Sequence, residues 1–143
     1  MRRLLLQAKR SDPRVRDCAS DLVKDIPGKN WRQEIDAIFY YVRDFIRYQL
    51  DPVEIETVQS PWETLSRGYG DCDDQALLVA SLLETIGHPT RFMAIGLKPR
   101  TLIHVYAQAK CGNDWISLDT TEMHNPGWEP PGIVNRLVIY NGS

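Results

Sequence analysis

The sequence contains few cysteines and no spacing that would group them. Three are present among 143 residues, an odd number, and no two of them form a Cys-x-x-Cys motif. Disulfide frameworks and zinc sites both need cysteines in sets with regular spacing, so neither is expected. A reducing compartment is the default for such a chain, and we predict no metal and no cofactor.

The chain also lacks a long hydrophobic run. The uncharged apolar stretch at residues 76–83 has eight residues, whereas a membrane-spanning helix needs roughly 20. Near the N-terminus the apolar residues 4–6 are followed at once by Gln7, Lys9 and Arg10, which leaves no apolar core for an export signal. We therefore expect no membrane segment and a cytoplasmic location.

Neither sign of charge dominates. The 17 basic and 19 acidic side chains give a formal net charge of −2, so bulk electrostatic binding to nucleic acid is not expected. Residues 1–29 form a basic N-terminal arm or helix, for which a solvated charged face is the simplest interpretation. Nucleic-acid binding through this arm is a further interpretation, and salt-dependent retention on DNA would test it. The cations of the arm are Arg2, Arg3, Lys9, Arg10, Arg14 and Arg16.

Internal repeats and low-complexity segments are absent as well. The composition is 43% hydrophobic and 25% charged, which is typical of globular proteins. The length suits one domain, and we predict that residues 1–143 form a single one. Its oligomeric state is not predicted.

The first ninety residues carry start and stop signals for helices. Residues 13–25 predict a first helix, which Pro27 and Gly28 end. Asn30 and Gln33 resemble a capping box, in which each side chain satisfies a free backbone N–H. Apolar residues at spacings of three and four then predict an amphipathic helix to about Tyr48.

Two more helices follow the loop that Asp51-Pro52 opens. Ser60-Pro61-Trp62-Glu63 is a second start signal, and Gly68 should end this short helix. A helix from Cys72 to Gly87 is apolar nearly all round, so other elements should bury it.

Beyond residue 89 the pattern changes to short runs rich in β-branched and aromatic residues. The runs 90–95, 102–108, 115–118 and 136–140 predict strands, and Gly112-Asn113-Asp114 predicts a hairpin turn. Helices followed by strands favour an α+β fold, in which the helix that begins at Cys72 packs on a small antiparallel sheet.

Cys72 is a candidate nucleophile. It opens a helix, where unpaired N–H groups and the helix dipole stabilise a thiolate, and Gly70 allows a tight turn before it. Asp71, Asp73 and Asp74 act against a thiolate if they point at it, although successive helical residues face different directions. The alternative is an acidic capping turn with an incidental cysteine. These acids do not match the offsets of an EF-hand calcium loop, so no metal is predicted.

A thiol nucleophile needs a base and a group that orients the base. His104 stands in the centre of an apolar strand, whereas His88 suits a helix end and His124 lies in a loop, facing either substrate or solvent. If residues 112–114 make a hairpin, the midpoint between His104 and Asp119 coincides with its turn, which predicts that these two side chains are cross-strand partners. The alternative is that Asp119 simply ends a strand.

Three segments occur in a recognisable order: Gly-Tyr-Gly-Asp-Cys-Asp-Asp at 68–74, His-Val-Tyr at 104–106 and Trp-Ile-Ser-Leu-Asp-Thr-Thr at 115–121. From about Tyr41 to Thr121 the chain resembles the transglutaminase-like superfamily, within the papain-like group of Cys-His-Asp enzymes. The Gly-Asp-Cys-Asp-Asp string is similar to that of compact bacterial and phage proteins, and a phage origin would imply a place in the virion.

The resemblance implies a papain-like core with Cys72 as nucleophile, His104 as base and Asp119 as its orienting partner. It also implies acyl transfer on protein or peptide substrates, at peptide or glutamine-type amides. A small domain favours protease-like hydrolysis over cross-linking. The backbone N–H of Cys72 and a side chain from upstream, Tyr48 or Gln49, would form the oxyanion hole.

Two further points follow from the resemblance. Trp128 could line the cleft or belong to a packed lid. Asp73 after Cys72 and Tyr106 after Val105 stand where the family often has residues such as Trp. The alternative function is a catalytically silent binding or assembly module with the same fold, for example a phage or bacterial structural component.

Overall fold

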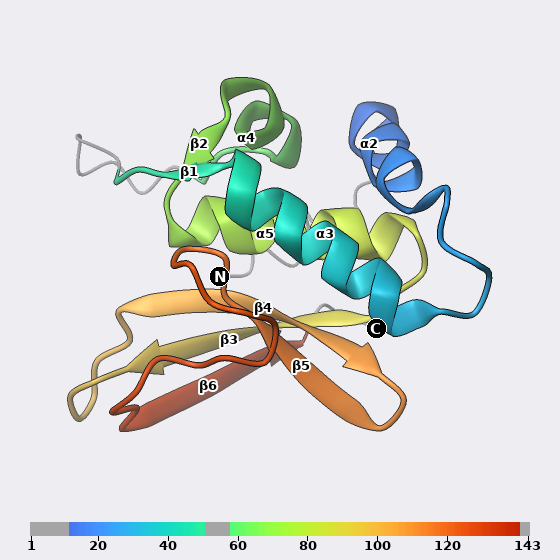
Figure 1. The fold of residues 1–143 in the computed structure, drawn as a ribbon. Coiled ribbons are helices and arrows are strands. Elements are labelled where there is room, and N and C mark those ends of the chain that lie inside the picture. The colour runs from blue at the N-terminus through green and yellow to red at the C-terminus, as the bar shows by residue number, and fades with distance from the viewer. Residues whose placement is uncertain (1–11, 51–57, 141–143) are drawn as a thin grey trace.

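The computed structural model describes residues 12–50 and 58–140, which form a helical layer on one face of a sheet (Figure 1). The sheet has four antiparallel strands in the order β5-β4-β3-β6, and the fold is therefore α+β, as the sequence predicts. The basic arm up to Arg10 and the loop at Asp51-Pro52 lie outside the described residues. The helices are α2 (Pro13–Val23), α3 (Trp31–Phe45), α4 (Pro61–Arg67) and α5 (Cys72–Thr85). The strands of the sheet are β3 (Thr90–Gly96), β4 (His104–Cys111), β5 (Asp114–Leu118) and β6 (Asn135–Tyr140).

Helix α5 is the centre of the core. All its residues from Asp74 to Leu83 are buried, because α2, α3 and α4 contact it on one side and β3 and β4 on the other. Each fully buried leucine contributes about 1.5–3 kcal/mol to folding, so α5 is firmly anchored. The first residue of this anchored helix is Cys72.

In the two described ranges, no helix combines the length and apolar character that crossing a bilayer requires.

Local signals place the ends of α4 correctly. The Ser60 hydroxyl accepts a hydrogen bond from the Glu63 N–H at 3.2 Å, Pro61 fills the first helical position, and Gly68 ends the helix with a φ of 76°. The capping box predicted before α3 is wrong. Asn30 donates from its amide nitrogen to Gln33 Oε1 at 2.6 Å, so the two side chains satisfy each other and not the backbone.

The end of α3 differs from the prediction. The helix stops at Phe45 and not near Tyr48, because Ile46 adopts an extended backbone. Residues Arg47–Tyr48 form a short strand, β1, which pairs in parallel with β2 (Tyr69–Gly70). Ile46 is buried from this extended position, which is why the apolar spacing continues past the helix. The pairing holds Tyr48 beside the segment that leads into Cys72.

Strands β4 and β5 form the predicted hairpin. Gly112, with a φ of 63°, lies in the turn, and Cys111 pairs with Asp114. Strand β4 begins at His104 and not at Leu102, so the histidine stands at the start of its strand. On the face of the sheet away from α5, Tyr106 packs in a smaller apolar cluster that includes Met93.

Candidate active site

Cys72 occupies the first position of α5 and is half-buried. Asp71 caps the helix by accepting the Asp74 N–H at 3.1 Å, and Asp74 accepts the Asp71 N–H in return, also at 3.1 Å. This reciprocal capping box fixes the backbone on both sides of the thiol. The thiol therefore lies at the positive end of the helix dipole, where an anion is stabilised.

Asp74, an acidic neighbour of Cys72, holds the local backbone through hydrogen bonds. The second oxygen of Asp74 accepts the Gln59 N–H at 2.7 Å, and burial raises the pKa of Asp74 to about 6. Gly70 allows this approach, because a Cβ at Gly70 would lie 2.6 Å from the Cβ of Asp74. A side chain at position 70 would thus displace the carboxylate that caps the helix.

His104 and Asp119 form an ion pair, with 2.8 Å between Nε2 and Oδ2. The side chain of Asp119 is 2% exposed and that of His104 is 20% exposed. They are not direct cross-strand partners as predicted, because Ala107 pairs with Leu118 and the register therefore sets Asp119 across from Tyr106. The pair is instead diagonal, a separation that long side chains still span.

Electrostatics favour a charged His104. Burial alone would lower its pKa, but hydrogen bonds with Asp119 and with the Cys72 thiol outweigh burial and raise the pKa to about 10. Burial alone would likewise raise the pKa of Asp119, but the hydrogen bond and charge of His104, with two hydrogen bonds from Thr121, keep it below its usual value. Because Nε2 binds Asp119, Nδ1 is the ring nitrogen left for the thiol. The structure thus brings Cys72, His104 and Asp119 into one chain of contacts.

Gln75 joins the two halves of this arrangement, and the sequence analysis missed it. Its amide nitrogen donates to the Gly70 carbonyl at 3.2 Å, and its amide oxygen accepts the Thr120 hydroxyl at 2.7 Å. The Gly70 carbonyl also accepts the Gln49 N–H at 3.0 Å. One buried amide therefore ties the segment before Cys72 to the residue after Asp119. The available signal was a polar residue inside a run predicted to be buried.

Gln75→Leu is expected to slow alkylation of Cys72 about 10-fold or more, because small displacements of reacting groups are costly. The free energy of unfolding should fall by about 1–3 kcal/mol, since the variant leaves Gly70 O and Thr120 Oγ1 without this partner. Iodoacetamide kinetics and urea unfolding measure the two effects.

The matched control is Ser81→Ala on the same helix. Among the described residues, the Ser81 hydroxyl is buried without a hydrogen-bond partner, so its removal should not destabilise the protein. Equal alkylation rates in Gln75→Leu and the wild type would show that the amide does not position the site.

The predicted oxyanion residues differ in position. Tyr48 lies within electrostatic range of Cys72 and Asp119: burial and these negative charges raise its pKa, which keeps the phenol protonated. Gln49 is exposed, and its contact with the site is through the backbone N–H. Of the two, Tyr48 is the residue whose side chain interacts electrostatically with Cys72.

Trp128 lies in the segment between β5 and β6 and stacks on His124, with ring centroids 3.7 Å apart. Arg43 of α3 donates to the His124 carbonyl at 3.0 Å. Next to Trp128, Glu129 accepts hydrogen bonds from Tyr106 and Arg136. This segment is thus fastened to both layers, and a role of Trp128 in binding substrate stays a prediction.

The carboxylates near Cys72 do not fit a metal ion. Across residues 12–50 and 58–140, no three His, Cys, Asp or Glu side chains gather in a way that would hold one. Both carboxylate oxygens of Asp74 and Oδ1 of Asp71 already accept backbone N–H groups.

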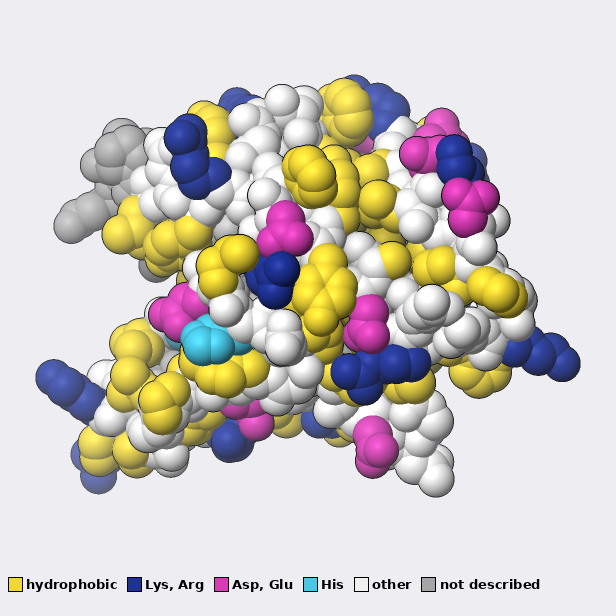
Figure 2. All heavy atoms as spheres, in the orientation of Figure 1, with side chains coloured by type: hydrophobic (Ala, Val, Ile, Leu, Met, Phe, Trp, Pro, Cys, Tyr) yellow, Lys and Arg dark blue, Asp and Glu magenta, His cyan; other side chains and the backbone are white. Residues whose placement is uncertain are grey.

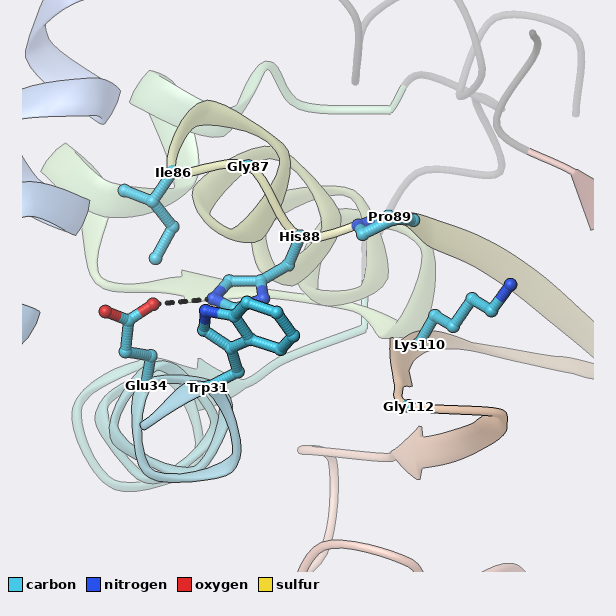
Figure 3. Close-up of a pocket in the computed structure, with 8 residues that line it drawn as sticks. All are labelled: Trp31, Glu34, Ile86, Gly87, His88, Pro89, Lys110 and Gly112. Carbon is cyan, nitrogen blue, oxygen red and sulfur yellow. Dashed lines mark hydrogen bonds and ion pairs between the residues drawn. The ribbon is translucent and has the colours of Figure 1, made fainter. Parts of the chain in front are cut away.

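A pocket of about 340 Å³ lies at the other end of α5 (Figure 3). It is lined by Trp31, His88 and Lys110, among others, and His88 pairs with Glu34 at 2.7 Å. Because α5 has 14 residues, its two ends are roughly 20 Å apart, and this pocket is separate from Cys72. His88 thus belongs to a different part of the molecule from His104.

Comparison with known proteins gives one family and several solved structures. The family described as the transglutaminase-like superfamily matches residues 20–120. No curated protein sequence matches significantly.

The similar structures include a proposed cysteine protease from Cytophaga hutchinsonii, at 21% identity and a TM-score of 0.66. A proposed protease from Parabacteroides distasonis has 16% identity and a TM-score of 0.69. The matches cover 96% and 85% of this chain but span only 46% and 25% of those proteins. Calcium-bound LapG from Legionella pneumophila has 20% identity and a TM-score of 0.64, over 94% of this chain and 82% of LapG. At these identities the likeness shows the fold.

Proposed function

Because the chain belongs to the transglutaminase-like superfamily, we propose that it is a cysteine-dependent enzyme that hydrolyses peptide or glutamine-type amides in proteins or peptides. The observation that carries the proposal is the contact chain from the Cys72 thiol through His104 to the buried Asp119. A nucleophile, a base and a group that orients the base are what nucleophilic catalysis requires.

The first half of the reaction forms a thioester. The Cys72 thiol first gives its proton to His104. Sγ then attacks the carbonyl carbon, and the oxygen becomes an anion held by the Cys72 N–H and, we propose, by the Tyr48 hydroxyl. The C–N bond then breaks as His104 gives its proton to the leaving nitrogen. Asp119 holds the imidazolium in orientation through its 2.8 Å contact.

The second half regenerates the thiol. His104 removes a proton from water, the hydroxide oxygen attacks the thioester carbon, and the C–S bond breaks. The proton passes from His104 back to sulfur. An amine in place of water would give a cross-link. Hydrolysis is favoured in this proposal because two of the similar structures are described as proposed proteases.

The test is a digestion of an internally quenched peptide library, with and without an excess of a primary amine, read by mass spectrometry. Hydrolysis predicts new carboxyl termini under both conditions. A product that gains the mass of the amine would instead identify a transamidase. A lack of both products would favour the silent binding module.

A further inference from the structure

Exposed apolar side chains gather on both sides of the candidate active site. The loop between β3 and β4 carries Leu97, Leu102 and Ile103, and Ile103 directly precedes His104. Tyr48, which interacts electrostatically with Cys72, and Leu50 are also exposed. Figure 2 shows hydrophobic side chains above and below a hollow that opens between the helical layer and the sheet. Monomeric proteins seldom expose apolar groups together without a function for them.

The loop holds these side chains out in a fixed conformation. The Ile103 N–H donates to the Ile95 carbonyl at 2.8 Å, and Asn135 Nδ2 donates to the Lys98 carbonyl at 2.7 Å. A Cβ at Gly96 would lie 1.6 Å from the Thr101 carbonyl oxygen, so the two ends of the loop are in close contact. Ile103 remains 62% exposed in this braced loop. An apolar surface that is fixed before binding loses little entropy when a ligand covers it.

The same loop is basic. Lys98 and Arg100 are exposed near its tip, and residues 96–103 contain no acidic side chain. Asp71 and Asp73, which flank Cys72 in the sequence, are acidic. A ligand along the loop would therefore meet apolar surface next to His104 and positive charge farther out.

We propose that this site takes an extended peptide with bulky apolar side chains beside the attacked amide and an acidic residue toward the tip of the β3–β4 loop. The inference rests on the proposed function and names its substrate class. Ile103 directly precedes His104, which contacts the Cys72 thiol, and an acyl group must reach that contact to react, so the occupant is a peptide. Leu102 and Ile103 would contact the apolar side chains, and Lys98 or Arg100 the carboxylate.

The test uses three internally quenched peptides that differ in few positions. The first has Leu and Ile around the central amide and an Asp beyond them, the second has Ser in place of both apolar residues, and the third has Lys in place of Asp. The Ser peptide should show a kcat/KM at least about 10-fold lower, since lost apolar contacts cost about this much each. The Lys peptide should lose about 3- to 10-fold through like-charge repulsion.

Ile103→Ser supplies the protein side of the test. It should raise the KM for the apolar peptide about 5-fold or more, with the rate of Cys72 alkylation by iodoacetamide unchanged. Trp31→Ser is the matched control. Trp31 is also a large exposed apolar side chain, at 55% exposure, but it is the first residue of α3, whereas Tyr48 follows the last. Equal cleavage of the Leu-Ile and Ser peptides, or an unaltered KM in Ile103→Ser, would overturn the proposal.

Binding of the same peptides to Cys72→Ala, measured by fluorescence anisotropy, separates the two failures. If Cys72→Ala binds the apolar peptide preferentially but the wild type cleaves none of the peptides, the proposed enzymatic function is refuted and the proposed peptide specificity stands. If the wild type cleaves all three peptides equally, the enzymatic function stands and the proposed specificity is refuted. Sedimentation gives a third outcome. Dimers that form with increasing concentration and are absent in Ile103→Ser, together with no peptide preference, would show instead that a second copy of the chain covers these side chains.

Discussion

Cys72→Ala is expected to abolish peptide hydrolysis and to leave the fold intact. The loss should exceed about 10³-fold, because the variant has no atom that can form the thioester. The fold should persist because the capping box of Asp71 and Asp74 does not use the thiol, and alanine suits a helix interior better than cysteine. Turnover of the best library peptide and urea unfolding measure the two effects.

Cys111→Ala is the control for this experiment. Cys111 is also part-buried and ends β4, at the opposite end of that strand from His104. Its replacement should leave turnover within a factor of about two, since it has no part in the contact chain. Turnover that survives in Cys72→Ala would reject the cysteine mechanism, whatever the control shows.

Alkylation of Cys72 by iodoacetamide is expected to be fast at pH 6 and to depend on His104. A base whose pKa is raised stays protonated as the pH increases through its ordinary value, so His104 keeps its positive charge up to about pH 10. That charge stabilises a neighbouring thiolate, and the rate should change little between pH 6 and 9. An unassisted thiol is only about 0.3% ionised at pH 6. His104→Ala should therefore slow the reaction at pH 6 by up to about 300-fold and restore a steep rise near pH 8 to 9.

The measurement needs a variant without Cys18 and Cys111, so that all alkylation occurs at Cys72. Asp119→Asn supplies an intermediate case, because the asparagine keeps a hydrogen-bond acceptor but removes the charge that helps to keep His104 protonated. Its rate at pH 6 should lie between those of the wild type and His104→Ala. Identical pH profiles in all three proteins would mean that the thiol is not activated by its neighbours.

Local signals predicted much of this structure because they involve residues close in sequence. The Ser60 cap, the Gly68 stop and the 112–114 turn each depend on a few neighbouring residues. The order of helices and strands followed, and with it the α+β class. The apolar composition of 76–83 also predicted correctly that the helix beginning at Cys72 is buried.

What the sequence could not predict depends on distant partners. The bond between Gln75 and Thr120 joins residues 45 positions apart, and no local pattern specifies it. The pairing of Arg47–Tyr48 with β2 is too short to show alternation, so apolar spacing extended the helix across it. The predicted register placed His104 directly across from Asp119, and the two residues are diagonal instead. Their contact was still predicted correctly, because side chains can reach across such a shift.

The placement of the thiol and the imidazole in different layers makes their contact sensitive to shear. Cys72 moves with α5, whereas His104 and Asp119 move with the sheet. The interface between α5 and β4 is largely apolar, so close packing and not hydrogen bonding resists a slide between the two layers there. A hydrogen bond between sulfur and nitrogen weakens steeply with the same slide. The bond of Gln75 to Thr120 is the directional contact that resists it. The contact between the Cys72 thiol and His104 should therefore be lost under heat or pressure while the backbone amides of α5 are still protected from hydrogen exchange.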